Sequence, residues 1–423
     1  MKPAAFFYLT LVALTLLAAC AQDKSTPKSN TIDNPYDKDN PVSKRNTMHN
    51  PYDNVSYSVR YANNQRNSFA NAKLASNGIL KWERTYIDDY RIRSKIPGPI
   101  SLYAANDVVG VQVNPILYLY RGSEFITAHY PIVNYTRDVC AFFSDRYTFF
   151  SYGPIKYWSY SDGTQFDIHP PHAGLNNRFW VPLLLLPVDD GLVFAQWFMG
   201  GPSRRPQSFM MYQYLPEMVF PEWAIGEDDG VNIILASSDS KRVIYVVKGT
   251  IHTVDIEYKV ERIGKFAPDL SSIISASLDF SDNLILHGTR QEVDVITAYS
   301  IHTQEKLWEY NVIGSVKNLQ PPVIGEDNSV FFVTDTILYC IKNGEHDWAL
   351  QIHPVSNPLM TIGKGNDILL QSDSHISAIT GRGDEIFRTR ITDDPESKFT
   401  APPVIGTDGL VYVSCYKRLY CFE

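Results

Sequence analysis

An Asp- or Asn-centred turn recurs along this chain and limits the folds that it can adopt. Each copy lies between two apolar runs, as the turn of a β-hairpin does. The copies are about 40 to 50 residues apart, which is the length of one four-stranded propeller blade. The eight copies are Asn106-Asp107, Asp145-Arg146, Asp190-Gly191, Asp229-Gly230, Asp282-Asn283, Asp327-Asn328, Asn366-Asp367 and Asp408-Gly409. The spacing therefore predicts an all-β fold, an eight-bladed β-propeller.

A second landmark marks the last strand of a repeat, where a large aromatic residue follows four positions after a turn residue. The pairs are Gly344 and Trp348, Gln304 and Trp308, Gly383 and Phe387, and Gly78 and Trp82. The last pair precedes the first turn, so residues 78–83 resemble an outer strand with no blade before it, whereas residues 404–422 resemble three strands with no fourth. We expect this N-terminal strand to complete the eighth blade and close the ring, because closure removes an exposed sheet edge.

Residues 298–308, Ala-Tyr-Ser-Ile-His-Thr-Gln-Glu-Lys-Leu-Trp, carry a family resemblance. They are similar to the Ala-x-Asp-x-x-Thr-Gly-Lys-x-x-Trp motif of pyrroloquinoline-quinone-like (PQQ-like) repeats. The resemblance extends over residues 271–423 and is faint in the first three blades. It implies one of two kinds of protein. Periplasmic quinoprotein dehydrogenases hold the quinone and Ca²⁺ in the centre of the ring, whereas the BamB family of outer-membrane assembly lipoproteins is non-enzymatic and binds other proteins.

The dehydrogenase interpretation lacks two features that the resemblance would require. No two cysteines are adjacent, and no Cys-x-x-Cys-His is present. Asp189, Asp190 and Asp279 are isolated acids that could act as metal ligands, but Asp190 belongs to the turn series, where backbone geometry favours Asp. His169 and His172 flank two prolines and form either a metal site or a rigid connection between blades. We expect no enzyme activity, no cofactor and no metal, with a quinoprotein dehydrogenase as the alternative.

The N-terminus resembles that of a bacterial lipoprotein. Lys2 precedes an uncharged, mostly apolar run that is too short to span a bilayer and ends in Leu17-Ala18-Ala19-Cys20. This resembles a lipobox and predicts a signal peptide over residues 1–19 and lipidation of Cys20, with several acyl chains as a lasting anchor. The residue after Cys20 is not Asp, which resembles sorting to the outer membrane, with the propeller in the periplasm. The alternative is an ordinary signal peptide cut after Ala19.

Residues 20–75 are rich in Asn, Asp, Ser, Lys and Pro and poor in aliphatic residues. Such a segment does not bury enough apolar surface to offset its ordering entropy. We therefore expect the lipidated Cys20 to be followed by a disordered tether with a reach of about 40 Å, and the propeller to occupy residues 76–423. Asn-Pro-Tyr-Asp occurs at residues 34–37 and again at 50–53, as either a docking motif or turn-prone linker.

The charge and one loop limit the partners. A formal net charge of −8 argues against a nucleic-acid partner, because no basic surplus is available for phosphates. The loop at residues 200–206 carries Arg204 and Arg205 between aromatic strands, and Arg and aromatics are enriched in interface hot spots. It is the candidate partner-binding site, with a solvated hairpin loop as the alternative. We expect the partner to be another envelope protein, such as the outer-membrane assembly machinery, with envelope glycan as a further alternative.

Four cysteines follow the predicted anchor. Cys340 and Cys421 occupy a position where the matching repeats have a small residue on their third strand, so we expect both to be buried. The repeat places these two in blades that are not neighbours, which disfavours a bond between them. Cys415 and Cys421 lie across one hairpin, diagonal rather than opposite. Export to an oxidising compartment leaves disulfides among Cys140, Cys340, Cys415 and Cys421 open.

Overall fold

The computed structural model describes residues 55–57, 68–74, 77–85, 101–105, 107–113, 116–129, 140–143, 147–151, 155–159, 165–168, 179–188, 191–199, 206–214, 223–225, 231–239, 242–255, 261–317, 320–352, 358–372, 374–391, 401–415 and 418–423. For the strands between residues 140 and 225 it describes the backbone alone. All of these residues belong to one compact unit, Arg45–Glu423.

The described strands form antiparallel sheets, numbered here 1 to 8, and the first four lie within residues 55–266. Sheet 1 contains β1 (Val55–Tyr57), β3 (Ser101–Ala105), β4 (Val108–Val113), β5 (Ile116–Arg121) and β6 (Glu124–His129). Sheet 2 contains β7 (Cys140–Phe143), β8 (Tyr147–Ser151), β9 (Ile155–Ser159) and β10 (Gln165–Ile168). Sheet 3 contains β11 (Phe179–Val188), β12 (Gly191–Met199), β13 (Pro206–Tyr214) and β14 (Trp223–Ile225). Sheet 4 contains β15 (Val231–Ala236), β16 (Arg242–Val247), β17 (Thr250–Asp255) and β18 (Glu261–Phe266).

The other four sheets have four strands each. Sheet 5 contains β19 (Ser272–Leu278), β20 (Asn283–Arg290), β21 (Val293–Ser300) and β22 (Lys306–Asn311). Sheet 6 contains β23 (Val323–Ile324), β24 (Val330–Val333), β25 (Ile337–Lys342) and β26 (Glu345–Gln351). Sheet 7 contains β27 (Leu359–Ile362), the short 3-10 turn η2 (Lys364–Asn366), β28 (Ile368–Ser372), β29 (His375–Ile379) and β30 (Glu385–Arg390). Sheet 8 contains β31 (Val404–Ile405), β32 (Val411–Cys415), β33 (Arg418–Phe422) and β2 (Leu80–Thr85).

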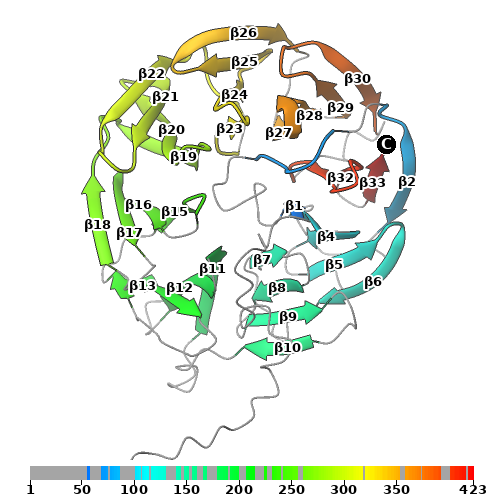
Figure 1. Ribbon diagram of the computed structural model, residues 1–423, viewed down its shortest axis with the longest axis horizontal. Coiled ribbons are helices and arrows are strands. Elements are labelled where there is room, and N and C mark those ends of the chain that lie inside the picture. The colour runs from blue at the N-terminus through cyan, green and yellow to red at the C-terminus, as the bar shows by residue number, and fades with distance from the viewer. Residues whose placement is uncertain are drawn as a thin grey trace, which may run out of the picture. The chain divides into compact units, whose positions relative to one another are not determined.

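The fold is therefore all-β and propeller-like, with consecutive sheets side by side around a common centre (Figure 1). Buried apolar side chains fill the contacts between sheets 4 and 5, 5 and 6, 6 and 7, and 7 and 8. Sheet 8 also packs on sheet 1, where Leu102, Tyr118 and Tyr412 belong to one cluster. Sheets 5 to 8 each bury both faces, which explains the long apolar runs in their middle strands.

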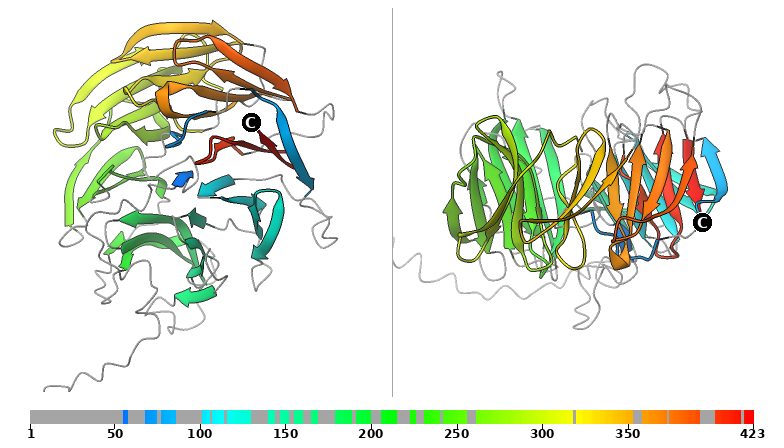
Figure 2. Two further views of the ribbon diagram at one scale, coloured as in Figure 1. Left: turned by 45° about the vertical axis from the view of Figure 1, so that its right-hand side comes forward. Right: turned by 90° about the horizontal axis from the view of Figure 1, so that it is seen from above.

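The N-terminal strand β2 pairs with β33, as the sequence predicts. Trp82 lies opposite Cys421 and Glu83 lies opposite Tyr420 in an antiparallel register. Figures 1 and 2 show the blue strand β2 beside the red strands of the C-terminus. Chain segments more than three hundred residues apart thus share sheet 8, and β2 covers the edge that β33 would otherwise expose.

The recurrent Asp and Asn residues have two structural roles. Asp282, Asn328 and Asn366 have φ values of 58°, 62° and 64°, the left-handed region that Asn and Asp tolerate better than most residues. Their side chains also accept hydrogen bonds from the turn of the preceding sheet. The bonds join Ser238 N to Asp282 Oδ1 (2.7 Å), Phe280 N to Asn328 Oδ1 (3.0 Å) and Glu326 N to Asn366 Oδ1 (2.7 Å). The repeated turn thus links consecutive sheets.

The turn predicted for the fourth repeat is wrong. Asp229-Gly230 lies outside the described residues, immediately before β15, and β15 is the first strand of sheet 4. The turn between β15 and β16 instead includes Ser237 and Asp239, whose side chains are hydrogen-bonded to each other at 2.5 Å. Asp-Gly is favoured in any tight turn, including a connection between sheets, so the dipeptide alone does not identify its place in the repeat.

The glycine of the second landmark makes room for the aromatic residue of the preceding sheet. A Cβ on Gly344 would lie 2.8 Å from Cβ of Trp308, and one on Gly383 would lie 3.2 Å from the ring of Trp348. Sheet 5 differs, because Gln304 replaces the glycine. There the residue of sheet 4 that faces it is Gly264, whose added Cβ would collide with the Gln304 amide. In this pair the glycine belongs to the earlier sheet and the large side chain to the later one, the reverse of the other pairs.

The predicted end of the tether at residue 75 is too late. Ser68 and Ala70 have no exposed surface, and Phe69, Ala72 and Leu74 are at most 7% exposed. These residues, 68–74, are called the strap below. Most of these side chains are small and bury little apolar area themselves, so the composition of the segment does not indicate that it is buried. Their burial comes from neighbours distant in sequence, and the sequence also does not indicate β1, which pairs with β3. Residues 1–54 lie outside the described residues.

Candidate protein-binding surface

One end of sheet 5 extends past its neighbour. Strands β20 and β21 have eight residues each, whereas the corresponding strands of sheet 6, β24 and β25, have four and six. The turn between β20 and β21 consists of Gln291 and Glu292, with φ values of 48° and 68°. Two residues with positive φ form the type I′ turn that matches strand twist. The residues at this end of the hairpin are partly or fully exposed, whereas the middle of both strands is buried.

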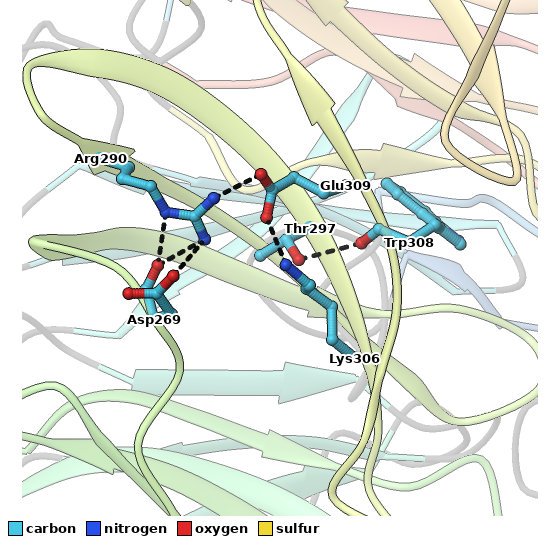
Figure 3. Close-up of polar contacts among 6 residues, drawn as sticks. All are labelled: Asp269, Arg290, Thr297, Lys306, Trp308 and Glu309. Atoms are coloured by element: carbon cyan, nitrogen blue, oxygen red, sulfur yellow. Dashed lines mark hydrogen bonds and ion pairs between the residues drawn. The ribbon is translucent and has the colours of Figure 1, made fainter.

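Arg290, the last residue of β20, holds this end together. Side chains alternate along a strand, so Arg290 lies on the same side as Leu284 and Leu286, which pack with residues of sheet 4. Its guanidinium donates from Nε (2.9 Å) and Nη2 (2.6 Å) to the Asp269 carbonyl. Nη1 lies 2.5 Å from Glu309 Oε1 on β22, as Figure 3 shows. Arg290 therefore joins the chain before β19 to both middle and outer strands of sheet 5.

Two cations share the carboxylate of Glu309. Lys306 Nζ lies 3.0 Å from Oε2, while Arg290 occupies Oε1. The hydrogen bond from Arg290 lowers the pKa of Glu309 and raises the pKa of Arg290. The two paired side chains are only 19% and 26% exposed. Partial burial and two hydrogen bonds make this network stronger than an isolated surface pair, which contributes about 0–1 kcal/mol.

Exposed aliphatic side chains accompany this network. Val293 is 46% exposed and directly opposes Arg290 in the hairpin. The amide of Val312 donates to the Asp294 carbonyl at 2.9 Å, which continues the pairing of β21 with β22 up to the residue before Ile313. Ile313 is 74% exposed. Aliphatic residues with an adjacent arginine and a charged rim match the composition of protein interfaces. We call Asp269, Arg290, Val293, Glu309 and Ile313 the hairpin-end surface.

Asp294 holds the loop that carries Ile313. Its Oδ2 accepts hydrogen bonds from Ser315 Oγ (2.9 Å) and Val316 N (2.8 Å). Its Oδ1 lies 3.8 Å from Nε2 of His287, a side chain that is nearly buried. Burial lowers the pKa of His287, and the nearby Asp294 carboxylate raises it in part. The two hydrogen bonds to Asp294 Oδ2 hold the loop that bears Ile313 against β21.

The site residues expected from the sequence lie mostly outside the described part of the chain. Cys20, Arg204, Arg205, His169 and His172 all do, as do Asp189 and Asp190. Asp279 is described and nearly buried. Its Oδ1 accepts hydrogen bonds from the backbone amides of Ser281 and Asn283, both at 2.8 Å. Asp279 thus stabilises the turn after β19, and its oxygens are engaged there.

Cys340 and Cys421 are both buried, as expected, and neither forms a disulfide; Cys415 is buried as well. Cys340 lies opposite Trp348, and Cys421 lies opposite Trp82, which are the equivalent positions of sheets 6 and 8. Burial raises the pKa of both thiols to about 12, so neither is reactive at neutral pH. Cys415 lies opposite Arg418 rather than Cys421.

Sequence reasoning did not select any residue of the hairpin-end surface. The one sequence signal for this surface is the polar pair Gln291-Glu292 between two apolar runs. That pair predicts a hairpin, but it does not predict which residues of the hairpin the neighbouring sheets leave exposed. Within the described ranges, no three His, Cys, Asp or Glu side chains are grouped so that they could hold a metal ion. No helix in that part of the chain is long and apolar enough to cross a bilayer.

A scan against models of known protein families found no match to this chain, and a search of curated proteins found no relative.

Proposed function

We propose that this chain is a non-catalytic scaffold of the cell envelope that binds another protein. The observation that carries the proposal is the hairpin-end surface, where exposed Val293 pairs with Arg290 in the β20–β21 hairpin and exposed Ile313 lies in the loop that Asp294 holds. A preformed surface of this kind loses little conformational entropy when a partner binds. The loop of Arg204 and Arg205 is a second, sequence-based candidate for the same role.

We further infer that sheets 1 to 8 are the eight blades of one closed PQQ-like ring, with β2 as its closing strand. Two contacts support this inference: β2 pairs with β33, and sheet 8 packs on sheet 1. The proposed BamB-like lipoprotein carries lipid on Cys20, lies at the outer membrane and presents the ring to the periplasm. Its partner is then another envelope protein, with the outer-membrane assembly machinery as the favoured class.

The inner side of the sheets favours a scaffold over a quinoprotein dehydrogenase. Phe69 of the strap packs edge-on against Phe280, with ring centroids 4.9 Å apart, and Gln320 donates to Ser68 Oγ at 3.2 Å. The strap thus contacts sheets 5, 6 and 7 near the centre, where a dehydrogenase of this type would hold its quinone. Purified protein supplied with pyrroloquinoline quinone, Ca²⁺ and a panel of alcohols should not reduce an artificial acceptor. Reduction at enzymatic rates would establish the dehydrogenase instead.

The binding proposal is tested with a double variant, Val293→Asp with Ile313→Asp, in the full-length chain. Both side chains are exposed, so folding should be unaffected, whereas two added carboxylates should disrupt an apolar contact. A matched control is Ile386→Asp, an exposed isoleucine on β30 outside the surface. Each protein is used to recover partners from detergent-solubilised envelopes, followed by mass spectrometry.

We expect the wild type and the Ile386→Asp control to recover one common protein, and the double variant to bind it at least about thirtyfold more weakly. That factor corresponds to about 2 kcal/mol, the usual threshold for an interface hot spot. Equal recovery by all three proteins would remove the hairpin-end surface from the interface. Recovery of no protein by the wild type would contradict the scaffold proposal.

A further inference from the structure

The strap lies along the inner strand of sheet 7 without belonging to any of its hairpins, and it bends at Asn71 and Ala72, where the amide of Ala72 donates to the Ala70 carbonyl at 2.7 Å. The amide of Ala70 donates to the Ile362 carbonyl at 2.7 Å, and the amide of Ile362 donates to the Ser68 carbonyl at 3.0 Å. The amide of Lys364 donates to the Ala72 carbonyl at 2.8 Å. The two bonds of Ile362 form a single parallel β-bridge between Phe69 and Ile362, the kind of backbone pairing by which a sheet edge recognises a peptide.

From Ala70 to Leu74 the side chains of the strap alternate between buried and exposed. Ala70, Ala72 and Leu74 belong to the apolar cluster between sheets 7 and 8, whereas Asn71 and Lys73 are exposed. The approach is close, because a Cβ on Gly363 would lie 2.8 Å from the Ala72 carbonyl oxygen. The groove therefore selects a backbone with small side chains at alternate positions.

Specific contacts fix the start of the strap. The Phe69 ring lies against Phe280 of sheet 5. The side chain of Gln320 accepts a hydrogen bond from the amide of Met360 at 2.8 Å and donates one to the Met360 carbonyl at 2.7 Å. It also donates a hydrogen bond to Ser68 Oγ. Gln320 thus joins sheet 7 to the strap. These contacts define the register in which Phe69 enters the groove.

We propose that the groove along Ile362–Lys364 is a peptide-binding site and that the strap is its resident ligand. The site accepts a peptide with the pattern Phe-Ala-x-Ala-x-Leu that bends between its two alanines, in which the alanines are buried and the intervening residues are exposed. In the native chain the strap occupies the site at the high effective concentration of a tethered ligand. A free peptide therefore binds only when the tethered copy has been weakened.

The test uses the full-length chain and a labelled peptide of residues 66–76. Ala70→Asp with Ala72→Asp introduces carboxylates at buried positions and should vacate the groove. The matched control, Asn71→Asp with Lys73→Asp, changes the two exposed neighbours and should leave the strap in place. Fluorescence anisotropy should detect the peptide on the first variant but not on the control or the wild type.

A second peptide carrying Ala72→Asp should bind the vacated chain at least about tenfold more weakly. Absence of binding to the vacated, folded chain would overturn the proposal, as would equal affinity for both peptides.

Hydrogen exchange in the wild-type chain keeps the proposal testable if the first variant does not fold. A separable ligand must leave by a local opening that costs less than global unfolding. The amides of Ala70 and Lys364 should therefore exchange faster than that of Leu370, a buried residue within sheet 7. Exchange of all three only through global unfolding would show that the strap is an inseparable part of the core, and would refute the proposal.

Discussion

Replacing Gly344 by Ala should destabilise the propeller by much more than the same change at two other glycines. Gly344 has a φ of 81°, and its added Cβ would lie 2.8 Å from Cβ of Trp308. Gly122 has a φ of 54° but no atom within 4 Å of an added Cβ. Gly264 lacks a positive φ, and its added Cβ would meet only the terminal amide of Gln304. The three sites thus separate backbone strain from packing.

The magnitudes follow from these environments. Left-handed backbone costs a non-glycine residue about 1–2 kcal/mol, which applies to Gly122→Ala and to Gly344→Ala. Trp308 Cβ is fixed to the backbone, so overpacking should add about 1–3 kcal/mol at Gly344. The Gln304 amide can rotate away, so Gly264→Ala should cost less than about 1 kcal/mol.

Urea unfolding, monitored by tryptophan fluorescence, measures the three free energies of unfolding. We expect the loss to increase in the order Gly264→Ala, Gly122→Ala, Gly344→Ala. Equal losses for Gly122→Ala and Gly344→Ala would refute the claim that the turn glycine of sheet 6 exists to admit the aromatic residue of sheet 5.

Two further predictions concern the N-terminus and pH. Cys20→Ala should move the protein from the membrane pellet to the soluble fraction, because the proposed acyl anchor is lost; unchanged pelleting in mild salt would argue against lipidation. Burial lowers the pKa of His287 below its unfolded value of about 6.5. The unfolded state therefore binds more protons, and the stabilisation present above that pH is lost as pH falls. His287→Gln should reduce the difference between urea midpoints at pH 7.5 and pH 5.5; an unchanged difference would exclude His287 as its source.

The sequence predicted the sheets well because their turns carry local chemistry. Asp282, Asn328 and Asn366 need both a left-handed backbone and a side-chain acceptor, and few residue types supply both. The aromatic residue of each copy of the second landmark likewise follows a turn residue by four positions, so the sequence alone identifies it. The fourth repeat was misplaced because Asp-Gly indicates a turn without specifying which strands it joins.

The strap and the hairpin-end surface depend on tertiary structure and were not predictable in this way. Ala70 and Ala72 are buried because Gly363 allows the strap to approach, almost three hundred residues away in the chain. Val293 and Ile313 are exposed because the neighbouring sheets end before they do. Neither local propensity nor hydrophobic pattern contains that information.

A disulfide-trapping measurement tests the ring-closing role of β2 most directly. Trp82 lies opposite Cys421 in the β2–β33 register, so Trp82→Cys should form a disulfide with the native Cys421 when the unfolded chain is refolded under mild oxidation, because both thiols are accessible until the strands pair. Arg84→Cys, whose partner is Leu419, should not form this bond and serves as the control. Peptide mapping by mass spectrometry should find position 82 linked to Cys421. Absence of that link, or an equal yield from the Arg84→Cys control, would contradict the pairing on which closure depends.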